Sequence, residues 1–216
     1  MLKRFTVENC RGFQKELVFD LSARDYEFNQ GLVRNGLVNK AIIYGPNGIG
    51  KSSLGIALFD IVAHLTDKQK IRDQYQDNYR NLESDSKVIL FDYLFVFDGF
   101  TVFYEYAKND AGDLLWERLI INNVLVVDYN FFDTSHQFVD RTQVGELNIN
   151  LTDNKLSVVK YIYRNLPTGT IPALTRMIQF CENMLWYRCL SDGNTYAGFT
   201  NGGSRLSKVI YEKEAL

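Results

Sequence analysis

The segment Gly45–Ser52, with the sequence GPNGIGKS, constrains this chain more than any other part of it. It matches the phosphate-binding pattern G-x-x-x-x-G-K-[ST] at every fixed position. The β-branched run 41–44 precedes it and predicts a short buried strand, and the apolar run 53–63 after it predicts a helix. A strand, a glycine-rich turn and a helix in this order are the setting that a phosphate loop requires.

The residue types explain how such a loop would hold phosphate. Gly48 and Gly50 allow backbone dihedral angles that a Cβ forbids, so that several N–H groups can converge on one anion. The start of the following helix adds free N–H groups and a positive dipole end. Lys51 is expected to reach the β- and γ-phosphates, and the Ser52 hydroxyl to bind Mg²⁺. The alternative is a glycine-rich turn that binds nothing. With ATP and Mg²⁺ as ligands, the predicted binding residues are Asn47, Gly48, Ile49, Gly50, Lys51, Ser52 and Ser53.

Composition excludes several classes of protein. The chain of 216 residues is 46% hydrophobic and 23% charged, which is typical of a globular protein and not of a disordered one. Its net charge of −2 does not indicate a nucleic-acid partner, which stays open. No apolar stretch reaches the roughly 18 residues of a membrane span, so we expect no membrane partner. Three scattered cysteines and no signal-peptide pattern favour reduced thiols and a cytoplasmic location.

We interpret residues 1–216 as one lobe. Hydrophobic periodicity distinguishes three regions within it. Region 1–65 holds the loop, its helix, and strands at 2–8 and 15–21 around a turn at 9–12. Region 88–130 alternates with period two and predicts an antiparallel β subdomain. Its Asp98-Gly99 predicts a hairpin turn with both residues at positive φ. Its aromatic stripe is interpreted as core packing, with base stacking as the alternative. Region 151–216 is helical, with helices expected at 156–166 and 171–187.

Hydrolysis would need a second carboxylate on Mg²⁺, at the end of an apolar strand. Two runs imitate such a strand: one ends at Asp92 and the other at Asp128, and a tyrosine follows each. We favour Asp128 as the metal ligand because aromatic alternation surrounds Asp92. His64 lies late in the first predicted helix and is interpreted as structural and not as a ligand.

The N-terminal residues resemble a known group of ATPases. Phe5-Thr6-Val7-Glu8-Asn9-Cys10-Arg11-Gly12-Phe13 resembles the opening strand and turn of ABC-type ATPase heads of the SMC, RecF and OLD (overcoming-lysogenization-defect) group, in which G-P-N-G-x-G-K-S follows. Four further segments resemble OLD-like AAA-type ATPases from bacterial defence loci. They are the Phe-rich hairpin, Tyr104-Glu105-Tyr106, Glu117-Arg118-Leu119, and Tyr196-Ala197-Gly198-Phe199 with Gly202-Gly203.

The resemblance implies a fold and a function. The fold class would be α/β: a P-loop NTPase with an ABC-ATPase-like head, an inserted antiparallel β subdomain and C-terminal helices. Arg11, on the first strand–turn, would approach the nucleotide phosphates. The heads would form a nucleotide-dependent homo-oligomer that controls an effector protein of the nuclease or Toprim type in antiviral defence.

The chain departs from this family in its second half. A signature motif, an apolar strand ending in Asp-Glu and a switch histidine are not found, and Gly202–Ser207 carries signature letters in the wrong order. Gln137 and Gln143 are the candidates for a residue that senses Mg²⁺. We therefore expect the N-terminal part of a head, which binds ATP without efficient hydrolysis. The alternatives are a DNA-repair or chromosome-maintenance head of RecF or SMC type, a complete small P-loop kinase or GTPase that uses Asp128, and a scaffold that holds nucleotide only for stability.

Overall fold

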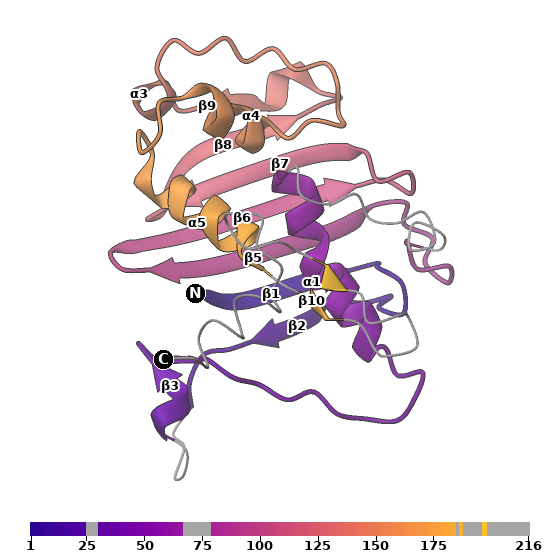
Figure 1. Ribbon diagram of the computed structural model, residues 1–216. Helices are drawn as coiled ribbons and strands as arrows, with labels where there is room; N and C mark the ends of the chain where they lie inside the picture. Colours follow the sequence, from indigo (N-terminus) through magenta and orange to yellow (C-terminus); the bar gives the residue numbers. More distant parts are fainter. Residues whose placement is uncertain (25–29, 67–78, 185, 188–195, 198–216) are drawn as a thin grey trace.

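The computed structural model describes residues 1–24, 30–66, 79–184, 186–187 and 196–197. The chain is mixed α/β, with a seven-stranded sheet in the order β2-β1-β5-β6-β7-β8-β9 and few helices (Figure 1). Every neighbouring pair in this sheet is antiparallel. The strands are β1 (Leu2–Glu8), β2 (Leu17–Asp20), β5 (Ile89–Phe97), β6 (Phe100–Lys108), β7 (Leu114–Ile121), β8 (Val124–Asn130) and β9 (Gln137–Val139).

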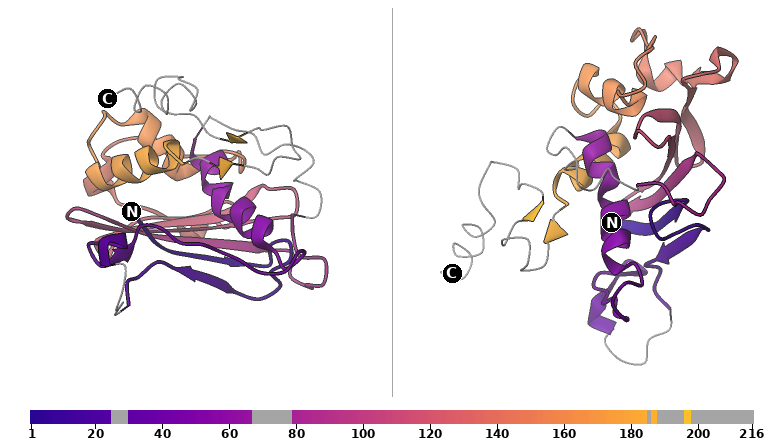
Figure 2. Two further views of the ribbon diagram at one scale, coloured as in Figure 1. Left: turned by 60° about the horizontal axis from the view of Figure 1, so that its bottom comes forward. Right: turned by 90° about the vertical axis from the view of Figure 1, so that its right-hand side faces the viewer.

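The main helices cover one face of this sheet (Figure 2). They are α1 (Lys51–Leu65), α4 (Val158–Asn165) and α5 (Pro172–Glu182), and a short α3 (Arg141–Val144) precedes α4. Pro172 occupies the first turn of α5, as its fixed φ favours. The smaller elements are η1 (Gln30–Leu32), η2 (Thr134–His136) and two strand pairs, β3 (Val33–Arg34) with β4 (Leu37–Val38) and β10 (Trp186–Tyr187) with β11 (Tyr196–Ala197).

Most of the predicted strands and helices are confirmed, with small differences at their ends. The helix after the phosphate loop ends at Leu65, and the two C-terminal helices are shorter than their periodic runs. The strands of region 88–130 do not form a sheet of their own, because β5 pairs with β1 as well as with β6. Region 88–130 therefore extends the sheet that the N-terminal strands begin.

The hairpin at Asp98-Gly99 is confirmed, but the reason given for its turn is wrong. Phe97 pairs with Phe100 across the turn, and only Gly99 has a positive φ, of 81°. Both central residues are left-handed in the next hairpin instead, where Asn122 and Asn123 have φ of 50° and 65°. Asparagine tolerates this conformation better than most residues, and a turn of this type matches the twist of the flanking strands.

The aromatic stripe is a core, as predicted. Phe91, Tyr93, Phe95, Tyr104 and Tyr106 are each at most 1% exposed, and they point to the side of the sheet that the helices cover. Their rings stack on one another across β5 and β6, with centroids 5.1 Å apart for Phe91 and Tyr106. Cross-strand packing of this kind stabilises a sheet and leaves these rings inaccessible to bases.

The strand predicted at 41–44 is wrong. These residues form no regular element and pair with no strand, and Ile42 and Tyr44 are each 90% exposed. A strand is stable only when a neighbour satisfies its N–H and C=O groups, and no described strand pairs with this segment. Among the described residues, the β-branched run therefore has none of the parallel neighbours that a buried P-loop strand would have.

Several predictions fall on residues outside the described part of the chain. They are the segment Gly202–Ser207, with its signature letters, and the residues Gly198, Phe199, Gly202 and Gly203 of the resemblance to OLD-like ATPases. Within the described residues, none of the helices combines the length and the apolar character that crossing a bilayer would take.

Candidate phosphate-binding site

The predicted loop is exposed and ends at the start of α1. Residues 45–49 and Ser52 are exposed to solvent. Gly48 and Gly50 have φ of 84° and 103°, so that both occupy the region that favours glycine. Gly50 is the N-cap of α1 and no side chain caps the helix there. The first N–H groups of α1 are therefore available to an anion, as the sequence predicts.

The Lys51 side chain folds back over the loop. Its Nζ donates hydrogen bonds to the carbonyl oxygens of Gly45 and Pro46, both at 2.7 Å. This places a positive charge across the turn that Gly48 and Gly50 shape. An ammonium group that sits on loop carbonyls in an exposed site can exchange these contacts for phosphate oxygens, so the residues present fit an anionic ligand.

The turn that carries Arg11 lies against this loop. A Cβ placed on Gly50 would lie 3.3 Å from the Phe13 ring, so the turn and the loop are in contact. Arg11 itself has a left-handed φ of 51°. The structure thus brings the predicted Arg11 turn beside the phosphate loop through Phe13, and the backbone holds Arg11 in a conformation that is uncommon for its residue type.

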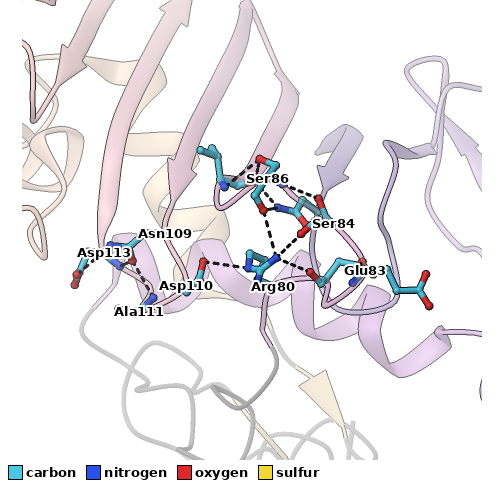
Figure 3. A network of polar contacts seen from close by, with 11 residues as sticks. Arg80, Glu83, Ser84, Ser86, Asn109, Asp110, Ala111 and Asp113 are labelled. Atoms are coloured by element: carbon cyan, nitrogen blue, oxygen red, sulfur yellow. Dashed lines mark hydrogen bonds and ion pairs between the residues drawn. The ribbon is translucent and has the colours of Figure 1, made fainter.

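The segment after the undescribed stretch fixes the Arg11 turn in place. Arg11 N donates to Tyr79 O at 2.8 Å, and Asn81 Nδ2 donates to Arg11 O at 2.6 Å. Arg80 organises this segment (Figure 3): its Nη1 donates to Ser84 O at 2.7 Å, and its Nε lies 3.2 Å from an Asp110 carboxylate oxygen. The turn beside the loop is therefore tied to the β6–β7 connection.

The structure does not bring Asp128 to the loop. On β6, Tyr104 and Tyr106 point toward α1, so Glu105 between them points to the opposite face of the sheet. Arg118 lies beside Glu105 on this face and donates to it at 2.8 Å and to Asp128 at 3.1 Å. Asp128 is thus an ion-pair partner on the face away from α1 and Ser52.

Asp92 lies on the same far face, because its neighbour Tyr93 contacts α1. Burial raises the pKa of Asp92 above its ordinary value. Gln137 donates to Asn130 O and Gln143 to Asp140, so both glutamines are used in the local structure of the β8–α3 region. Within the described part of the chain there is no group of three or more His, Cys, Asp or Glu residues that could hold a metal ion. Ser52 alone remains at the loop as a predicted Mg²⁺ ligand.

Sequence reasoning missed a buried ion pair on α1. Asp60 is 1% exposed and accepts hydrogen bonds from Tyr79 at 2.6 Å, Tyr106 at 2.7 Å and Lys108 at 2.6 Å. Burial alone would raise the pKa of Asp60, but the Lys108 ammonium and the hydrogen bonds hold it below its ordinary value. The sequence did contain a signal for this buried residue: Asp60 is the single carboxylate in the apolar run 53–63, and its spacing places it on the same helix face as the buried Ile56 and Ala57.

One turn further along α1, His64 begins a second buried cluster. Its side chain is 4% exposed, stacks on Tyr106 with ring centroids 4.2 Å apart, and hydrogen-bonds the Tyr104 hydroxyl. Tyr104 in turn donates to Glu117 at 2.8 Å, and His64 Nε2 lies 3.7 Å from the same carboxylate. Burial lowers the pKa of His64 below its ordinary value, and Glu117 opposes this. The structural role predicted for His64 agrees with this burial.

The buried carboxylate of Glu117 is satisfied at the start of α4. It accepts hydrogen bonds from Ser157 Oγ at 2.8 Å and from the backbone N–H of Val158, the first residue of α4. Ser157 also caps that helix through Lys160 N at 3.0 Å. A carboxylate at a helix N-terminus is a favourable arrangement, which explains how a charge with 0% exposure is tolerated there.

Comparison with known proteins adds no family to these observations. No protein-family model matches the sequence, and a search of curated proteins finds no match.

Proposed function

We propose that this chain binds ATP through Gly45–Ser53 and belongs to the head of an ABC-like ATPase of OLD type. The observation that carries the proposal is the exposed glycine loop at the uncapped start of α1, with Lys51 folded across it. Backbone N–H groups of the loop and of the first turn would hold the phosphates, with Arg11 approaching from the adjacent turn. Bound Mg²⁺ would bridge phosphate oxygens, with the Ser52 hydroxyl as its protein ligand.

In this proposal nucleotide acts as a switch in a cytoplasmic bacterial defence system. Heads associate when ATP is bound, and the homo-oligomer controls an effector of nuclease or Toprim type. Only a group that ADP lacks can bias the two states, so the γ-phosphate supplies the difference. The structure brings neither Asp92 nor Asp128 to Ser52, since both face away from α1. This favours binding without efficient hydrolysis by these residues over a complete small kinase or GTPase that uses Asp128.

The direct test is the affinity for Mg·ATP by isothermal titration calorimetry. Lys51→Ala removes the ammonium that would contact the phosphates, and we expect Kd to rise by about tenfold or more. Lys87→Ala is the matched control, because it removes the same charge from an exposed residue that is not part of the loop. Equal affinities for the two variants would refute the proposal. Steady-state ATP turnover by the chain alone would favour a complete enzyme, and salt-sensitive DNA binding would favour a RecF or SMC head.

A further inference from the structure

Two hydrogen-bonded clusters fix α1 to the sheet, and the phosphate loop belongs to neither. Asp60 contacts β6 through Tyr106 and Lys108, and His64 contacts β6 and β7 through Tyr104 and Glu117. Both side chains lie in the second half of α1, whereas the loop enters the helix at its first residue. The side chains of α1 that make these contacts are therefore remote from its ligand-binding end.

These polar contacts set the orientation of α1 in a way that its apolar contacts do not. Apolar burial is nearly independent of direction, so Ile56, Ile61 and Val62 would accept a small rotation of the helix. Hydrogen bonds weaken steeply when misaligned. Asp60 accepts three of them while almost fully buried, so a rotation or slide of α1 would leave a charge without its partners.

An α-helix carries such an orientation along its whole length. Lys51 lies nine residues before Asp60, which is about 14 Å along the axis at the usual rise per residue. Gly50 is joined to the helix by the hydrogen bond from Leu54 N to Gly50 O at 2.9 Å. A rotation of α1 therefore turns the N–H groups that face the loop by the same angle.

We propose that Asp60 and His64 are positioning residues for the phosphate loop, and that the contacts from His64 through Tyr104 to Glu117 couple the loop to the start of α4. The coupling rests on the proposed nucleotide binding, whereas the orientation of α1 does not. Coupling is reciprocal in binding free energy. If a partner that shifts α4 changes the affinity for nucleotide by some factor, bound nucleotide changes the affinity for that partner by the same factor.

A matched pair of tyrosine substitutions tests the coupling. Tyr104→Phe removes the hydroxyl that joins His64 to Glu117 and keeps the ring. Tyr129→Phe is the control: Tyr129 is also buried in the sheet, but its hydroxyl donates to Leu151 O at 3.1 Å and contacts nothing on α1. The affinity for Mg·ATP is measured for both variants under conditions in which circular dichroism shows that they are folded. We expect Kd to rise about fivefold in Tyr104→Phe and to stay within about twofold in Tyr129→Phe.

A second measurement needs no nucleotide. Amide hydrogen exchange of residues 54–59 reports how firmly α1 is held, and we expect it to quicken about fivefold in Tyr104→Phe and to be unchanged in Tyr129→Phe. Equal exchange in the two variants would overturn the positioning role whether or not ATP binds. A third outcome would refute the coupling of the loop to α4. In it, the exchange rates of the two variants differ and wild-type protein binds Mg·ATP through Lys51, but the two variants have the same Kd. If Lys51→Ala binds as wild type does, the proposed function fails, and exchange alone decides the positioning role.

Discussion

Replacing Lys108 with methionine tests whether Asp60 is held as a buried carboxylate. In the folded chain Lys108 Nζ lies 2.6 Å from Asp60, and the two side chains are 9% and 1% exposed. Methionine keeps much of the length of lysine and has no charge, so the carboxylate would keep only the hydroxyls of Tyr79 and Tyr106. Removing one partner of a buried ion pair costs about 3–5 kcal/mol, and we expect the lower end because two hydrogen bonds remain.

Urea unfolding followed by circular dichroism measures this cost. With a slope of about 2 kcal/mol per molar urea, a loss of about 3 kcal/mol lowers the midpoint by about 1.5 M. The double variant Asp60→Asn with Lys108→Met leaves no charge at this site, so we expect it to recover at least half of the loss. A Lys108→Met variant as stable as wild type, or a double variant no more stable than this single one, would refute the buried ion pair.

The stability deficit of Lys108→Met should also depend on pH, in a direction that follows from the pKa of Asp60. In wild type the folded pKa of Asp60 lies below its ordinary value of 3.8, so its stabilising contribution is present above that value and is lost as pH falls through the folded pKa. Without Lys108, burial dominates and the folded pKa rises above the ordinary value. The stability deficit of Lys108→Met should therefore shrink between about pH 7 and about pH 5, and a constant deficit would contradict the reasoning.

Two further predictions concern His64 and a hairpin turn. Because burial lowers the folded pKa of His64 from its ordinary 6.5, the unfolded chain takes up the proton first, and stability is lost as pH falls below that value. His64→Gln should lack this part of the loss, which urea midpoints at about pH 7.5 and about pH 5.5 would show; equal losses would contradict it. Asn123 has a φ of 65°, so Asn123→Gly should raise the free energy of unfolding by about 0.5 kcal/mol and Asn123→Val should lower it by about 1 kcal/mol. Thermal unfolding of both variants measures the difference, and the reverse order would refute a turn with two left-handed residues.

The sequence predicted the elements whose signals are local. The alternation from Val88 to Ile121 needs no distant information, because side chains on a strand change face at every residue. The helix from Lys51 to Leu65 likewise follows from its apolar spacing and the glycine at its start. These local patterns account for the confirmed hairpins and for the buried aromatic face.

Two of the failures share a physical cause, which is that the partners of a segment or side chain lie far away in the chain. Residues 41–44 have the composition of a buried strand, but a strand also needs neighbours, and composition does not say whether they are there. Asp60 and Lys108 are 48 residues apart, and only the folded sheet brings them together. Asp128 ends an apolar run as a metal ligand would, yet the alternation of the strand directs it to the far face.

The central claim is that the loop before α1 receives the phosphates of ATP. Backbone amide resonances of residues 48–53, followed by NMR as Mg·ATP is added, test it most directly. We predict that these amides shift together and saturate with one Kd, and that Lys51→Ala raises this Kd by about tenfold or more while Lys87→Ala leaves it unchanged. Shifts confined to other parts of the chain, or no shift at saturating nucleotide, would contradict it.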